Sequence, residues 1–123
     1  MSGTDRPLIA LAGLAGLLGV ALSARAAHVE GGGSLDIAAR FLLIHAAALL
    51  GLAALVGQGA LHPRLGRIAA GLLVAGLALF CADLSVRVFR GVPLLPFAAP
   101  LGGIALMAGW GMTIVAALVR SRA

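Results

Sequence analysis

Four long apolar stretches, separated by short polar or proline-containing segments, constrain this chain more than any other feature. About 20 consecutive apolar residues suffice to cross a membrane as a helix, and we predict spans over about 8–27, 41–61, 67–89 and 101–119. Hydrophobic residues make up 62% of the 123 residues and charged residues only 11%, whereas soluble domains average about 25% charged residues. The sequence therefore predicts an all-α integral membrane protein, with residues 1–123 as a single domain.

The connections between the stretches are short. A glycine turn at 31–33 precedes the second stretch, Pro63 follows it, and Pro93, Pro96 and Pro100 interrupt the segment before the fourth. Helices joined by short connections pack antiparallel. We therefore expect an antiparallel bundle of four transmembrane helices.

The first stretch has two interpretations. The small-x-small string Ala24-Arg25-Ala26 resembles a signal-peptide cleavage site. Small residues at helical spacing, Ala12 with Gly16 and Ala15 with Gly19, are instead typical of a retained helix that packs closely on its neighbours. We expect a retained helix.

All nine basic side chains are arginines, spread singly or in pairs between the apolar stretches rather than in a basic stripe. This distribution marks helix ends and does not indicate nucleic-acid binding. The end of the bundle with both termini carries five arginines: Arg6, Arg64, Arg67, Arg120 and Arg122. The opposite end carries four, so the positive-inside rule predicts cytoplasmic termini, in the inner membrane if the protein is bacterial.

Polar residues converge near the end of the bundle away from the termini, and we predict a candidate polar cluster of His28, Arg40, His45, Asp83 and Arg87. An acid at membrane depth normally faces the bundle and finds a partner, and Arg87 follows Asp83 at the spacing of a helical ion pair. The pair can be purely structural, or the cluster can form a pocket for an ion, a proton or a small ligand.

Two histidines at similar depth could in principle ligate a metal or haem, but His28 and His45 lack the helical spacing of known ligand motifs. We therefore predict no metal and no cofactor. No nucleophile-and-base set is visible, and we predict that the chain is not an enzyme. Three further residues are expected to be structural or solvated: Cys81 as a packed apolar residue, Trp110 as a packing residue, and His62 as a solvated loop residue.

Several strings resemble one family: Ala26-Ala27-His28, Phe41 to Leu50 around His45, Leu79-Phe80, Pro100-Leu101-Gly102-Gly103 and Gly109-Trp110. Together with the length, they resemble the YgdD-like family of small inner-membrane proteins, whose eukaryotic relatives are called transmembrane protein 256. The family has no known function, so the resemblance implies the fold and no mechanism. This chain has Phe41-Leu42 where the family typically has Tyr-Gln, and Ala82-Asp83 where it has Gly-Ser.

Two function classes follow. The first is a non-catalytic accessory or structural membrane subunit, whose partners are the lipid bilayer and other membrane proteins or further copies of itself. Small residues on several helices favour it, because they allow other helices to approach closely. The alternative is a small transporter or channel that uses the polar cluster around Asp83 and His45.

Overall fold

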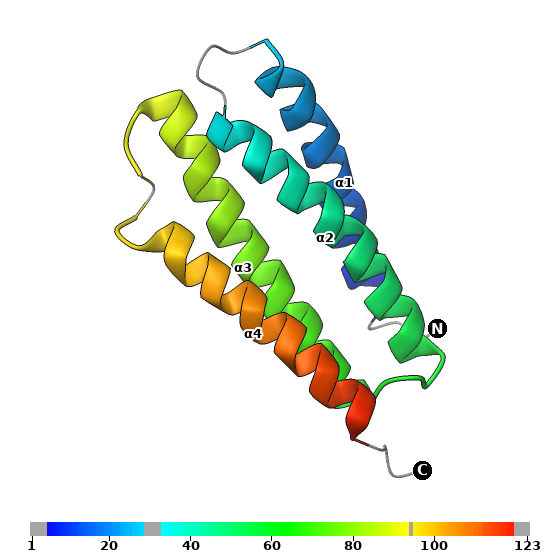
Figure 1. Cartoon of the computed structure of the whole chain (residues 1–123). Helices are drawn as coiled ribbons and strands as arrows, with labels where there is room; N and C mark the ends of the chain where they lie inside the picture. Colours follow the sequence, from blue (N-terminus) through cyan, green and yellow to red (C-terminus); the bar gives the residue numbers. More distant parts are fainter. Residues whose placement is uncertain (1–4, 29–32, 94, 120–123) are drawn as a thin grey trace.

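The chain consists of four helices over its described part, in a computed structural model that describes residues 5–28, 33–93 and 95–119 (Figure 1). The helices are α1 (Arg6–Ala26), α2 (Gly33–Gly57), α3 (Pro63–Arg90) and α4 (Ala98–Leu118). Each is long and apolar enough to cross a membrane. The predicted all-α four-helix fold is confirmed, and the chain is a multi-pass membrane protein.

The helices pack as two hairpins, α1 on α2 and α3 on α4, which are joined through contacts between α2 and α3. Figure 1 shows α1 and α4 on opposite sides of the α2–α3 pair. No other pair of helices packs extensively over the described residues. One side of α1 is therefore left without a helical neighbour.

Glycines set the distance between helices within each hairpin. A Cβ atom on Gly102 of α4 would lie 2.6 Å from the Phe80 nitrogen and 2.8 Å from the Gly76 oxygen of α3. On α1, a Cβ atom on Gly19 would lie 2.8 Å from Leu43 Cγ of α2. Close backbone approach of this kind replaces the hydrophobic driving force that lipid does not supply.

The second helix begins at Gly33, eight residues ahead of the predicted apolar span 41–61. Its first turns bury Leu35, Ala38 and Ala39, while Asp36 and Arg40 form an ion pair on the exposed side. Asp36 and Arg40 share one face of the helix because they lie four residues apart. Ser34, which the sequence suggests as the N-cap of this helix, lies inside its first turn.

The other helices differ from the predicted spans by smaller amounts. The first runs from residue 6 to 26 instead of 8 to 27, the third from 63 to 90 instead of 67 to 89, and the fourth from 98 to 118 instead of 101 to 119. The third helix is longer than its predicted span at both ends, whereas the first and fourth begin earlier and end one residue short of theirs.

His62 connects the two hairpins at the end of the bundle that carries the termini. Its backbone is not helical ahead of Pro63 (φ −56°, ψ 122°), and its Nδ1 accepts a hydrogen bond from the Leu65 nitrogen at 3.3 Å. Its own backbone nitrogen donates to the Ala116 oxygen at 3.0 Å. The expectation of a merely solvated His62 is wrong, because the residue caps α3 and ties it to the end of α4.

Candidate functional site

Asp83 and Arg87 form an ion pair within α3, as the sequence predicts. Arg87 Nε lies 3.0 Å from Asp83 Oδ2. The Asp83 side chain is fully buried, whereas that of Arg87 is 44% exposed. The pair therefore places a carboxylate inside the bundle and carries its countercharge out towards the surface.

Arg40 pairs with Asp36 and not with another residue of the predicted cluster. Its Nε donates to Asp36 Oδ2 at 2.9 Å, and its side chain is 74% exposed. Arginine can keep its charged group in water while its stem lies along apolar surface. This pair therefore belongs to the outer face of α2.

His45 lies near the middle of α2, whereas the sequence suggested a place near the end of the bundle away from the termini. It follows Gly33 by twelve positions, which corresponds to a depth of about 18 Å along α2. Trp110 follows Ala98 by the same number of positions in α4, which runs parallel to α2. The two side chains therefore meet at the same depth.

The contacts of His45 define its protonation state. Trp110 Nε1 donates to His45 Nε2 at 3.2 Å, and His45 Nδ1 lies 2.8 Å from the Phe41 oxygen. The indole nitrogen is only a donor, so His45 Nε2 must be the acceptor and Nδ1 must carry the proton that goes to Phe41. In this arrangement both ring nitrogens of His45 are engaged, one as acceptor and one as donor.

Aromatic rings surround this histidine. The His45 and Trp110 rings have centroids 5.8 Å apart, His45 stacks on Phe41 at 5.8 Å, and Phe41 contacts Phe80 of α3 at 4.6 Å. Three helices thus meet around one polar interaction. Trp110 contributes a polar contact beyond the packing role that the sequence indicated.

The five predicted cluster residues fall into separate environments. Asp83 pairs with Arg87, Arg40 with Asp36, and His45 with Trp110, while His28 is exposed just after the end of α1. The grouping of all five into one pocket stays a prediction. A metal or haem on His45 Nε2 would have to displace the Trp110 hydrogen bond, and the described residues contain no group of three or more metal-ligating side chains.

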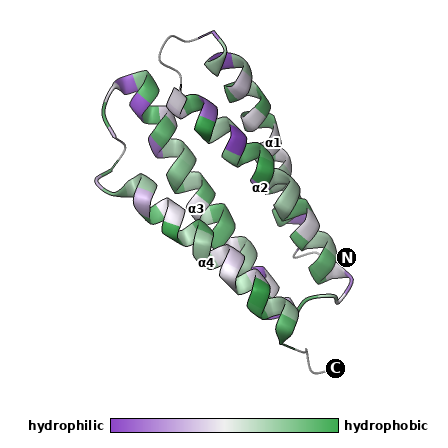
Figure 2. Cartoon of the chain, viewed as in Figure 1, coloured by the Kyte–Doolittle hydropathy of each residue, from purple (hydrophilic) through white to green (hydrophobic). Residues whose placement is uncertain are grey.

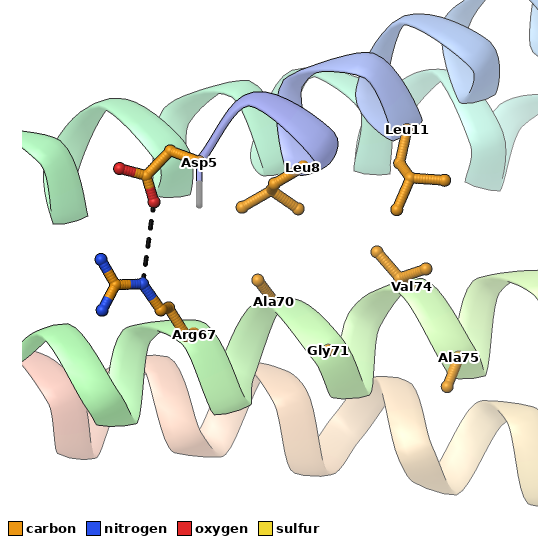
Figure 3. Close-up of a pocket in the computed structure, with 8 residues that line it drawn as sticks. All are labelled: Asp5, Leu8, Leu11, Arg67, Ala70, Gly71, Val74 and Ala75. Carbon is orange, nitrogen blue, oxygen red and sulfur yellow. Dashed lines mark ion pairs between the residues drawn. The ribbon is translucent and has the colours of Figure 1, made fainter. Parts of the chain in front are cut away.

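A second polar feature, which the sequence analysis did not single out, lies at the opposite end of the bundle. Asp5, at the start of α1, is buried, and its Oδ1 lies 3.8 Å from Arg67 Nε of α3. Figure 3 shows the pair at one end of a gap between α1 and α3. We call this gap the α1–α3 groove; it has a volume of about 320 Å³ and is lined by Asp5, Leu8, Leu11, Arg67, Ala70, Gly71, Val74 and Ala75.

The groove continues deeper into the bundle. A further hollow of about 130 Å³ shares Leu11 and Val74 with it and extends to Leu18 on α1 and Ala78 on α3. Apart from the Asp5–Arg67 pair, all of the lining residues are apolar. The only sequence signals for this feature are an acid before the first span and an arginine at the start of the third.

Cys81 behaves as predicted. It is buried, and its thiol lies 3.5 Å from the Ala38 oxygen, so it links α3 to α2 as a small packed side chain. Burial of this kind is typical of a structural rather than a reactive cysteine.

The comparisons with known proteins agree with this architecture. Residues 20–103 match the family model described as "Protein of unknown function (DUF423)". No curated protein and no solved structure matched the chain. The matched segment contains all five cluster residues and Arg67, whereas Asp5 and Trp110 lie outside it. Because the match covers more than half of the 123 residues, the chain belongs to this family of uncharacterised proteins, which agrees with the resemblance stated above.

Proposed function

We propose that the protein is a non-catalytic accessory or structural subunit of the membrane. The observation that carries this proposal is that the buried polar side chains are engaged with other residues of the same chain. Over the part of the chain that the structure describes, the buried polar residues are Asp5, His45 and Asp83, and they contact Arg67, Trp110 and Arg87, respectively. Among the described residues, no buried side-chain nitrogen or oxygen lacks a hydrogen-bonding partner.

This pattern favours a structural role because a transport pathway needs polar groups that exchange partners with a solute. Ionisable residues in spans otherwise serve to pair with one another inside the bundle. Here the His45–Trp110 and Asp5–Arg67 contacts hold different helices together, and Arg87 neutralises the buried Asp83 within α3.

The outer surface of α2 offers a place for a partner helix. Ala47 and Gly51 are both exposed and lie four residues apart, the small-xxx-small spacing that allows close helix packing. A Cβ atom on Gly51 would meet nothing within 4 Å. This part of α2 is therefore unoccupied by the chain's own helices.

The test is native mass spectrometry of the tagged protein, extracted in a mild detergent from its own membrane. We expect a complex that contains another polypeptide or a second copy, and we expect Gly51→Leu to remove it. The matched control is Gly111→Leu on α4, where a Cβ atom also meets nothing within 4 Å and no small residue lies four positions away. A wild-type protein that is always a lone monomer would overturn the proposal.

A second candidate, a small transporter or channel, is favoured by one observation. Asp83 is a fully buried acid in a spanning helix, and such residues often mark ion or proton pathways. The test is proton or solute flux in liposomes with the wild type and Asp83→Asn. Flux that the variant abolishes would support a transporter, and equal flux would eliminate it.

A further inference from the structure

The geometry points to a binding site for one anionic phospholipid in the α1–α3 groove, with the phosphate at Arg67 and an acyl chain along the apolar lining. The inference concerns a ligand and is independent of the proposed subunit role. It rests on the shape of the groove, its length and the charge at its end.

The groove has one polar end and is otherwise apolar. Figure 3 shows Arg67 and Asp5 at that end, with Leu8, Leu11 and Val74 following along the two helices. Gly71 and Ala75 are small and leave room on the α3 side of the groove, and a Cβ atom on Gly71 would meet nothing within 4 Å. The space therefore accepts a chain that is thin and apolar.

The length of the groove matches half of a bilayer. From Arg67 to Ala78 is eleven residues of helix, or about 16 Å. The hydrocarbon core of a bilayer is about 30 Å thick, so one leaflet contributes about 15 Å. A lipid of that leaflet with its headgroup at Arg67 would extend its acyl chain to the end of the groove.

The charge at the polar end favours an anionic headgroup. Arg6 follows Asp5 in the sequence and Arg64 precedes Arg67 by three residues, and both are exposed, so three arginines and one aspartate lie at this end of α1 and α3. The Arg67 side chain is 45% exposed, and a guanidinium has five N–H donors with a geometry suited to phosphate. Basic pockets between transmembrane helices are known sites for anionic headgroups.

Substitutions of Asp5 and Arg67 distinguish two roles of Arg67, which are pairing with Asp5 and binding a phosphate. If Arg67 serves only to hold α1 through Asp5, then Asp5→Asn and Arg67→Gln should change lipid retention in the same direction. If Arg67 holds a phosphate, then Arg67→Gln loses the lipid. Asp5→Asn keeps or strengthens binding, because a negative charge next to the phosphate is gone.

The experiment is native mass spectrometry in mixed micelles with equal amounts of phosphatidylglycerol and phosphatidylcholine that have the same acyl chains. We expect one retained phosphatidylglycerol per wild-type chain, and we expect Arg67→Gln to reduce its retention about fivefold relative to phosphatidylcholine. Asp5→Asn should retain at least as much as the wild type. Gly71→Leu should retain neither lipid, whereas Gly111→Leu, whose helix does not line the groove, should behave as the wild type.

Three results would overturn the inference: equal retention of the two lipids by the wild type, equal loss in Asp5→Asn and Arg67→Gln, or a second protein copy in place of the lipid. Thermal unfolding of each variant, measured in the same micelles, shows that a loss of lipid is not a loss of fold. If Arg67→Gln does not fold, Arg67→Lys replaces it, since lysine keeps the charge but not the fork of N–H donors.

Discussion

The two ends of the bundle each contain an aspartate–arginine pair, and the pairs are built differently. Asp83 and Arg87 lie on one helix at 3.0 Å, four residues apart. Asp5 and Arg67 lie on different helices at 3.8 Å, across a groove that other side chains leave open. The first pair forms wherever α3 forms, whereas the second depends on how α1 is placed against α3. A local pair therefore neutralises a buried charge, and a long-range pair fixes helix position.

Loss of Arg87 should have the largest effect, since it leaves the carboxylate of the fully buried Asp83 without its nearest cation. We expect Arg87→Gln to lower the free energy of unfolding in detergent by about 2–3 kcal/mol, below the full value for a buried pair because Arg87 is partly exposed. The double variant Asp83→Asn/Arg87→Gln should recover most of this loss. Equal stability of Arg87→Gln and the wild type would refute the importance of the local pair.

The hydrogen bond from Trp110 to His45 is a long-range contact without an ion pair, and it can be compared with the two aspartate–arginine pairs. Trp110→Phe keeps the ring packing but removes the donor to His45, and we expect a loss of about 1 kcal/mol, as found for hydrogen bonds between membrane helices. Trp110 is the single tryptophan of the chain, so its fluorescence reports the contact directly. His45→Phe should shift the emission maximum of Trp110, and an unchanged spectrum would mean that the two side chains do not interact.

The long-range ion pair should matter less for stability than the local one. We expect Asp5→Asn to cost about 0.5–1 kcal/mol, because its distance is long and Arg67 is partly in contact with solvent. In Asp5→Asn, the rate of backbone amide hydrogen exchange should rise in α1 and not in the α3–α4 hairpin. Exchange that rises equally in both hairpins would show that α1 does not move as a separate unit.

The smallest effect is expected at the exposed pair on α2. Arg40→Gln removes a helical ion pair with the same spacing as Asp83–Arg87, but both side chains are exposed, and we expect about 0.3 kcal/mol. High salt should remove even this difference. A cost similar to that of Arg87→Gln would show that spacing and not burial governs the two local pairs.

The fold was predictable from the sequence because apolar length and short connections leave few alternatives. The ion pair of Asp83 with Arg87 was predictable as well, because helical spacing alone brings two residues four positions apart together. The contact of His45 was not, because its place in the sequence does not indicate which side chain of another helix lies at the same level.

Contacts between residues far apart in sequence could not be predicted in the same way. The contacts of His45 with Trp110 and of Asp5 with Arg67 depend on the register of whole helices, which apolar patterns do not determine. Small residues within the spans indicated that the helices approach closely, but not which residue faces which.

The tight packing of α3 on α4 has a consequence for how sequences of this fold can diverge. A side chain on Gly102 would collide with the backbone of α3, and one on Gly109 would lie 2.7 Å from Leu73 Cδ2. Most lipid-facing positions accept any apolar residue, so they can drift freely through mutation. Gly102 and Gly109, which face α3, cannot, and this gives a physical reason for their place in the strings that carry the family resemblance. Distant homologues should therefore be identifiable by the spacing of these glycines after hydropathy has ceased to distinguish them.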